Sequence, residues 1–407
     1  MKVNHDQFLE EGYLIVRNVI PPDELDALRS SYERLVEQQR AIWAQQRKPD
    51  DPPGGVWETG SQPRLLLHLS PLADQINEQT ANAVEIWLHE NMQGLSSELL
   101  GDADAAVTSM MLMCNPVRDH GPANWHRDLY PPFGAPVQGY VEDIIENGPR
   151  YVQWNLCLYD DDVLWVIPGS HARLNTAQEN ELLGTNPRVP FPNSVQTHLS
   201  AGDGVVYILP ILHWGSNYST KMRRTIHGGF STYTQYENTS YLKHLSAPAQ
   251  ATFERWIQQS EQMLENTVAA LRGTIQKDPA AYCAGLEKLH PGRGERGQML
   301  STIYLSKVAN RVYALKHLDL DSPEHIGIRN AAMMSHPMTL QWGASIADFF
   351  SKAEAKALWE RFKPIDARVQ SDVEQPAPGY EQRPSRYHFN EMPKDFGIAD
   401  FIASWNA

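Results

Sequence analysis

Hydrophobic and polar positions repeat with different periods along the chain, and these periods divide it into three parts. In the first part, a short apolar run at 12–16 lies between two segments with helical spacing. The second of these segments begins with two prolines and acidic residues, which mark a helix start. One face of it carries four apolar residues: Leu25, Leu28, Tyr32 and Leu35. We therefore expect a helix, a strand and a helix, with further helix over 72–100.

In the second part, residues 107 to about 235, the pattern changes to short apolar runs separated by turns. We expect strands at 108–114, 151–159, 163–167, 204–209 and 225–233. In YVQWNLCLY (151–159), a period of two places Val152 and Trp154 on one face and Gln153 and Asn155 on the other. Because no long helical pattern separates these runs, we expect an antiparallel barrel or a double-sheet jelly roll rather than a βαβ fold.

In the third part, after about residue 240, the pattern is helical. An apolar stripe runs through 251–273 and ends at a glycine. Ser351 and Glu354 have the spacing of a capping box, whereas 275–300 and 363–395 are polar and are expected to be loops. The predicted fold is α+β. We expect one domain over residues 1–240, with its core at about 105–235, and a helical extension over 241–407 that serves as a lid or an oligomerisation surface.

Composition narrows the class of protein. The chain has 407 residues, of which 42% are hydrophobic and 21% charged, as in ordinary globular proteins. A net charge of −14 disfavours binding to nucleic acid and to anionic membranes. Three widely spaced cysteines do not form a disulfide framework, and no apolar run approaches the roughly 18 residues of a membrane span. We expect a cytoplasmic protein that acts on a small molecule.

The candidate chemistry begins at NWHRDLY (124–130). In an extended segment, residues two apart point the same way, so His126 and Asp128 can face one ion. Two histidines and one carboxylate on one face of iron(II) leave three coordination positions open. The His-x-Asp pair alone has low specificity, and a third ligand is needed.

Four histidines compete for the place of the third ligand. His213 is preferred because it follows a turn and a strand in GDGVVYILPILHWGSN. His227 lies beyond an arginine pair and is expected to have a core role or to support the site. His171 belongs to a PGSH turn, where loop hydrogen bonds satisfy it. His120 lies on the loop that enters the motif and could contact substrate.

An arginine beyond His213 could hold a dicarboxylate. Such a side chain, brought in by the next strand, would grip the distal carboxylate of 2-oxoglutarate with two parallel hydrogen bonds. Arg223 and Arg224 point to opposite faces of a strand, so one of them enters the barrel. Arg224, 11 residues after His213 (224 − 213), is preferred on spacing. Gln153 and Asn155 need partners inside a barrel, and either a bound cosubstrate or neighbouring backbone would serve.

These segments, in this order, resemble the phytanoyl-CoA dioxygenase family, which includes the ectoine hydroxylases. The resemblance covers residues 1 to about 235 and rests on DQFLEEGYLIVRNVIPPDELDAL, WHRD, LWVIPGSHARLN and GDGVVYILPILHWGSN. It implies a double-stranded β-helix core, a cupin-like jelly roll, and iron(II) bound by His126, Asp128 and His213. It also implies 2-oxoglutarate bound by Arg224, and dioxygen as co-reactant in a hydroxylation.

Two departures from the family pattern bear on the cosubstrate and the substrate. The family often has a small hydroxyl residue two positions after the distal histidine. Gly215 stands there, so Ser216 becomes a candidate cosubstrate contact. A long segment at 131–150 is expected to overhang the site and to shape substrate choice.

Alternative functions differ in what they require of the site. A cupin-like enzyme or a binding protein would share the fold and the metal without turning over 2-oxoglutarate, and it would not need Arg224. The complete triad with an arginine favours the oxygenase. Because Asp128 is present, halogenation is disfavoured. Desaturation, demethylation and ring closure use the same ligands as hydroxylation, and the sequence specifies neither the substrate nor the choice among these outcomes.

Overall fold

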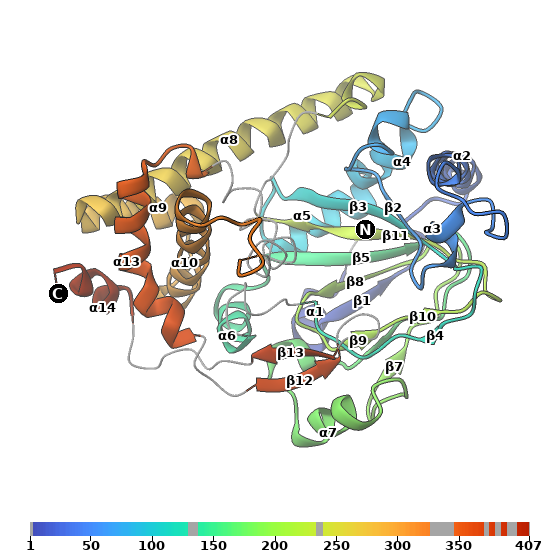
Figure 1. Cartoon of the computed structure of the whole chain (residues 1–407). Coiled ribbons are helices and arrows are strands. Elements are labelled where there is room, and N and C mark those ends of the chain that lie inside the picture. Colours follow the sequence, from blue (N-terminus) through green and yellow to red (C-terminus); the bar gives the residue numbers. More distant parts are fainter. Residues whose placement is uncertain are drawn as a thin grey trace.

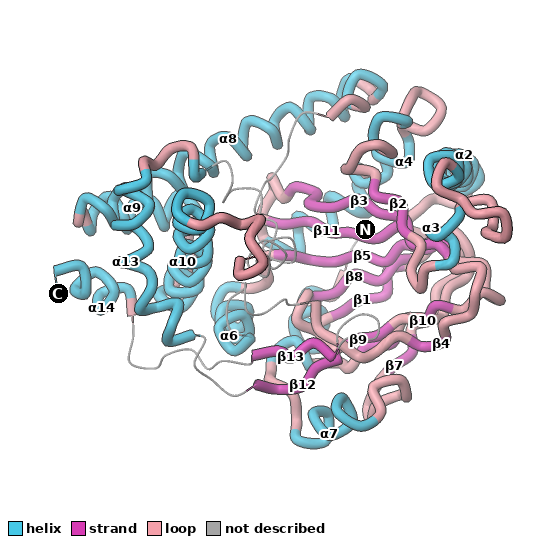
Figure 2. Tube along the Cα trace, viewed as in Figure 1, coloured by secondary structure: helices cyan, strands magenta, loops and turns pink. Residues whose placement is uncertain are grey.

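The computed structural model describes residues 3–128, 137–232, 239–325, 346–369, 374–378, 384–388 and 397–406. Strands occupy the centre of the molecule, helices cover one side of them, and a group of helices lies beyond one end (Figures 1 and 2). The expected mixture of helices and sheets is confirmed.

The larger sheet has six strands, and every neighbouring pair in it is antiparallel. Its order is β1-β8-β5-β11-β3-β2. The strands are β1 (Tyr13–Val16), β2 (Arg64–Leu66), β3 (Ala106–Cys114), β5 (Tyr151–Cys157), β8 (Gly204–Ile208) and β11 (Arg224–Ser231). Four of the five runs expected in the second part are strands of this sheet, and the expectations are confirmed with shifted ends.

Smaller sheets face one side of this large sheet. One of them has the order β7-β6-β9, and a separate two-stranded sheet pairs β10 with β4. Their bounds are β4 (Gly121–Pro122), β6 (Trp165–Val166), β7 (Val195–Gln196), β9 (His213–Trp214) and β10 (Ser216–Asn217). A buried apolar cluster that includes Val205, Tyr207, Val166 and Ile211 joins the two layers. His213, one of the candidate ligands, lies on β9 in the smaller layer.

The other side of the large sheet packs on helices. These are α1 (His5–Glu11), α2 (Leu25–Ala44), α3 (Gly55–Thr59), α4 (Asn82–Glu85) and α5 (Leu95–Leu100). As predicted, α2 buries Leu28, Tyr32 and Leu35. Trp154 and Leu156 of β5 belong to the same core, which confirms the faces assigned to that strand.

The helix expected over 72–100 is broken into short pieces. Besides α4 and α5 these are 3-10 turns and one π turn, η1 (Ala73–Gln75), η2 (Ile86–Leu88) and η3 (Glu90–Gly94). Asn77 and Thr80 bond to nearby backbone N–H groups, since Asn77 N donates to Thr80 Oγ1 and Gln79 N donates to Asn77 Oδ1. Such local bonds compete with helical ones and interrupt the helix.

Two helices that the pattern did not predict interrupt the strand region. They are α6 (Val137–Asn147) and α7 (Ala177–Thr185). In α7, Thr176 and Glu179 form a capping box, which stabilises a short helix with little amphipathic character. Residues 129–136, which include the beginning of the expected overhang, lie outside the described residues; its later part is α6.

The chain after residue 240 is mainly helical and has a second hydrophobic core. Its helices are α8 (Ala247–Gln276), α9 (Pro279–Leu289), α10 (Glu295–His317), α13 (Lys352–Val369) and α14 (Ile398–Ala403). The first half of α8 places Phe253 and Trp256 in the core behind the large sheet, and its second half places Leu271 in the second core. The Ser351–Glu354 capping box is confirmed. Among the described helices, none combines the length and the apolar character of a membrane span.

The prediction of a loop over 275–300 was wrong, because α9 and the start of α10 occupy most of this range. Asp278 caps α9 through Ala281 N at 3.0 Å, and Pro279 occupies the first turn, so the polar and proline residues begin a helix there. The loop expected over 363–395 was wrong in part. Helix α13 continues through Pro364 to Val369 because Phe362 and Ile365 are buried in the second core. Beyond it, β12 (Glu374–Pro378) pairs with β13 (Pro384–His388).

A buried charge cluster fastens the helical region to the start of β5. Asp143 Oδ2 lies 2.5 Å from Arg150 Nε and 3.4 Å from Arg293 Nη1. Arg150 Nη2 also donates to the carbonyl of Gly297, at 2.9 Å. The residue that precedes β5 is thereby tied to both α6 and α10.

Candidate metal centre

His126 and His213 come from distant parts of the chain and meet through a single antiparallel bridge. His126 N donates to His213 O at 2.9 Å, and His213 N donates to His126 O at 3.0 Å. This exchange places the two imidazole rings side by side, with centroids 4.4 Å apart. Asp128, two residues after His126, points to the same place.

The three side chains have the spacing of ligands to one ion. Asp128 Oδ1 lies 3.4 Å from His126 Nε2, and Asp128 Oδ2 lies 3.4 Å from His213 Nε2. All three ligand atoms lie within 4.8 Å of one another. Donors about 2.1 Å from one ion and at right angles to each other are about 3 Å apart. The donor set therefore fits a divalent metal with a facial arrangement of ligands.

Both imidazoles are held by backbone carbonyls two residues earlier in the chain. His126 Nδ1 donates to Asn124 O at 2.8 Å, and His213 Nδ1 donates to Ile211 O at 2.9 Å. These bonds place the proton on Nδ1 and leave the Nε2 lone pair facing the site, as in other metal-bound histidines. Both side chains are only 4% exposed, so few solvent contacts compete with the metal.

The surroundings of His126 and Asp128 shift their pKa values toward the protonation states that bind a cation. Burial, together with the neighbouring His213, lowers the pKa of His126 despite the opposing effect of Asp128. Burial opposes ionisation of Asp128, but His213 and His126 together hold the pKa of its carboxyl well below its usual value. At neutral pH, His126 is thus neutral and Asp128 is ionised, which are the forms that bind metal.

The polar face of β5 borders this centre. Gln153 Nε2 donates to Asp128 Oδ2 at 2.8 Å. Asn155 Oδ1 accepts from His227 Nδ1 at 2.5 Å. Burial, then Arg64 and Arg223, lowers the pKa of His227 to about 3 against the influence of Asp128, so this histidine is neutral. His227 supports the site rather than completing the triad.

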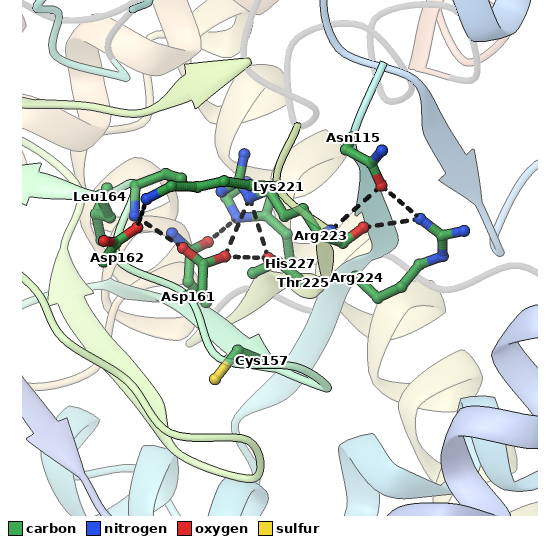
Figure 3. Close-up of polar contacts among 12 residues, drawn as sticks. Asn115, Cys157, Asp161, Asp162, Leu164, Lys221, Arg223, Arg224, Thr225 and His227 are labelled. Carbon is green, nitrogen blue, oxygen red and sulfur yellow. Dashed lines mark hydrogen bonds and ion pairs between the residues drawn. The ribbon is translucent and has the colours of Figure 1, made fainter. Parts of the chain in front are cut away.

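The two neighbouring arginines point to different faces of β11 (Figure 3). Arg223 lies with Thr225 and His227, and its Nε is 3.1 Å from Asp161 Oδ2. Arg224 turns to the helical side, where its Nε is 2.9 Å from Glu33 Oε1 of α2. The expectation that Arg224 enters the space between the sheets was wrong, because Arg223 occupies that face.

A family model described as phytanoyl-CoA dioxygenase (PhyH) matches residues 8–225, more than half of the chain. The chain belongs to the phytanoyl-CoA dioxygenase family. The match contains His126, Asp128, His213 and both arginines, and it ends before the helical region. The metal centre is therefore that of a family of non-haem iron, 2-oxoglutarate-dependent oxygenases.

Several solved structures are similar to this chain. AviO1 from Streptomyces viridochromogenes Tue57 is 21% identical, with 56% of this chain and 92% of that chain covered and a TM-score of 0.37. EctD from S. alaskensis is 16% identical, with 58% and 79% covered and a TM-score of 0.38. EvdO2 from Micromonospora carbonacea var. aurantiaca, solved with 2-oxoglutarate, is 17% identical, with 60% and 98% covered and a TM-score of 0.38. No curated protein matches the sequence.

Ser216 and Arg127 are two further buried residues near the motifs of this dioxygenase-family site. Ser216 is buried in β10, where it pairs with Pro122 of β4, and the contacts of the described residues do not join it to the triad. Arg127 lies between two ligands in sequence but points away from them. Its Nη1 donates to Ser170 O at 2.6 Å, and its Nε donates to Asn175 Oδ1 at 3.0 Å. Arg127 anchors the motif, and the alternation within His-Arg-Asp is the signal that could have revealed it.

Proposed function

We propose that this protein couples the oxidative decarboxylation of 2-oxoglutarate to the hydroxylation of a small organic substrate. The observation that carries the proposal is the convergence of His126, Asp128 and His213 on one point, at the spacing of a facial triad. We propose that these side chains hold iron(II), which when bound supplies the activation of dioxygen. The chain itself orients the reactants and excludes water.

Arg223 is the proposed anchor for the distal carboxylate of 2-oxoglutarate. Its side chain is 9% exposed, and its Nε is occupied by Asp161 and Thr225. Within the described part of the chain, neither Nη1 nor Nη2 of Arg223 makes a hydrogen bond. Two parallel N–H groups in a buried guanidinium match the two oxygens of a carboxylate.

Asn155 is a second proposed contact. Its Oδ1 is used by His227, while its Nδ2 has no hydrogen-bonding partner within the described part of the chain. The side chain is buried on the same face of β5 as Gln153, which donates to Asp128, and lies two residues nearer to the end of the sheet where Arg223 precedes β11. An amide N–H group donates to an acceptor where one is in reach, and a carboxylate or keto oxygen at this point would accept its hydrogen bond.

The fold around the site supports a direction for substrate entry. We infer that the two sheets form the double-stranded β-helix of the family, with Arg223 at one end and Tyr151 at the other. Substrate would then approach from the end bearing Tyr151. A cavity of about 30 Å³ lies there, lined by Tyr151 and Ser231 from the sheet, Tyr140 from α6 and Tyr304 from α10. The helical region after residue 240 would thus close the substrate end, and the boundary of the oxygenase domain would fall within α8.

The assignment of Arg223 is tested by two matched variants. Anaerobic calorimetry with iron(II)-loaded protein would measure the Kd of 2-oxoglutarate in Arg223→Met and Arg224→Met. Loss of a bidentate charged contact is expected to raise Kd about 10- to 100-fold in Arg223→Met. Arg224→Met is expected to stay within about threefold of wild type. The reverse result would restore the assignment made from spacing.

Turnover itself is tested by succinate release under air from iron(II)-loaded protein. We expect succinate to form from 2-oxoglutarate in wild type, and substrate screens to increase the rate. Iron-loaded protein that binds 2-oxoglutarate but forms no succinate, even slowly, would favour a cupin-like or binding protein with the same fold.

A further inference from the structure

Gln153 lies between the carboxylate of the metal centre and two tyrosines. Its Nε2 is 2.8 Å from Asp128 Oδ2 and 2.7 Å from the hydroxyl of Tyr207. Its Oε1 accepts from the hydroxyl of Tyr151 at 3.3 Å. The side chains of Gln153 and Tyr207 are both buried. Both amide hydrogens and the carbonyl oxygen of Gln153 therefore have partners.

The chemistry of the partners fixes the orientation of this amide. An ionised carboxylate only accepts hydrogen bonds, so the nitrogen of Gln153 must face Asp128. With both N–H groups directed at Asp128 and Tyr207, none is left for 2-oxoglutarate. This geometry disfavours the cosubstrate contact that the sequence suggested for Gln153.

The backbone presents Gln153 at a fixed place. In the sheet register, Gln153 lies between Gly229 of β11 and Tyr207 of β8. A Cβ at Gly229 would lie 2.4 Å from the hydroxyl oxygen of Tyr151. The absence of a side chain at Gly229 therefore gives room to Tyr151, whose hydroxyl reaches the carbonyl of Gln153. Neighbours on both sides limit the movement of the amide.

A fixed donor at Oδ2 has a consequence for the metal. A carboxylate can bind an ion through one oxygen or through both. In a facial triad, three positions must stay open for the cosubstrate and dioxygen, and a second carboxylate oxygen would occupy one of them. The bond from Gln153 engages Oδ2 and leaves Oδ1, 3.4 Å from His126 Nε2, as the oxygen free to bind.

We propose that Gln153 is a positioning residue of the metal centre, which makes Asp128 a one-oxygen ligand through Oδ1. The proposal rests on the proposed function and adds a role to a residue outside the proposed set of metal ligands. A neutral amide suits this role because it orients the carboxylate without cancelling its negative charge. A lysine or arginine at the same place would compete with the cation.

Cobalt(II), which reports ligand geometry in its visible spectrum, is the probe for the test. Gln153→Leu removes the donor while roughly keeping the volume, and Gln153→Met is a second variant in case leucine prevents folding. Loss of an outer-shell partner is expected to weaken cobalt(II) binding about 10- to 100-fold and to change the visible spectrum. Tyr151→Phe keeps the Gln153–Asp128 bond and is expected to change the Kd by less than about threefold.

Gln196→Leu is the matched control. Gln196 lies on β7 and donates to the carbonyl of Asp162 at 2.6 Å, away from the triad. It is expected to bind cobalt(II) with the wild-type Kd and spectrum. Thermal unfolding of the metal-free variants separates loss of folding from loss of the ligand geometry.

The two proposals fail in different ways. If folded Gln153→Leu or Gln153→Met binds cobalt(II) with the wild-type Kd and spectrum, the role of Gln153 is overturned. If wild type binds cobalt(II) but does not bind 2-oxoglutarate, the proposed function is overturned. The cobalt(II) spectra of the variants would then still decide the role of Gln153.

Discussion

Arg223 and Arg224 are consecutive in the chain, yet they serve opposite faces of β11. Arg223 contacts Asp161 in the space between the sheets, and Arg224 pairs with Glu33 of α2. Figure 3 shows Arg223 beside Asp161 and Thr225, whereas Arg224 turns away from them and contacts Asn115. We therefore expect removal of Arg223 to weaken the binding of 2-oxoglutarate and removal of Arg224 to lower stability.

Arg224→Ala is expected to lower stability. The side chain of Arg224 is 7% exposed and that of Glu33 is 35% exposed, so part of the ion pair is screened by water. Asn115 Oδ1 also loses its bond from Arg224 Nη1, which is 3.0 Å long. We expect the free energy of unfolding to fall by about 1–3 kcal/mol, measured by urea denaturation of metal-free protein. An unchanged midpoint would show that the pair contributes nothing.

The contrast between the two arginines shows where the sequence stops being informative. A count of residues from His213 to the arginine pair does not specify the conformation of the residues between them. The register of β11, in which Thr225 pairs with Cys157 of β5, decides instead which of its side chains face each side of the sheet. That pairing depends on the whole sheet, and so the choice between neighbouring positions could not be made from spacing.

The triad was predictable because its signals are local. His126 and Asp128 share a side through the period of two in an extended segment, and His213 follows a strand with a clear apolar pattern. The faces of β5 were predictable for the same reason. The contact of Gln153 with Asp128 was not, because the two residues lie on segments brought together only by the fold.

Acidification is expected to destabilise the metal-free protein through His227. Its pKa is about 3 in the folded state and about 6.5 in the unfolded state. Between these values the unfolded chain binds a proton that the folded protein does not bind. The free energy of unfolding therefore falls as pH decreases from about 6.5 to about 3, by about 1.4 kcal/mol per pH unit for this group.

Urea denaturation at several pH values in this window checks the prediction. The side chain introduced by His227→Gln does not titrate. We therefore expect the free energy of unfolding of this variant to fall less steeply with decreasing pH, by about 1.4 kcal/mol per pH unit. His290, whose pKa is also well below its usual value through burial and the nearby Arg150 and Arg293, should still contribute. Identical slopes in wild type and His227→Gln would contradict the buried neutral state.

A side chain at Gly229 is expected to disrupt the sheet beside the site. A Cβ there would lie 2.3 Å from Val152 O and 2.4 Å from the hydroxyl oxygen of Tyr151. Backbone cannot yield as a flexible side chain does, so Gly229→Ala is expected to lower the free energy of unfolding by about 3 kcal/mol. Gly215, where a Cβ meets nothing within 4 Å, is the matched control. Gly215→Ala is expected to change it by less than about 0.5 kcal/mol, and equal effects would refute the close contact.

The most direct test of the central claim is anaerobic titration of metal-free protein with iron(II) and 2-oxoglutarate. The chelate of a 2-oxo acid on an open iron(II) site gives a weak visible charge-transfer band near 500 nm (roughly). We predict that the band appears in wild type, is lost in His213→Ala, and needs more 2-oxoglutarate in Arg223→Met. Iron demonstrably bound to wild type with no band at saturating 2-oxoglutarate would contradict the account.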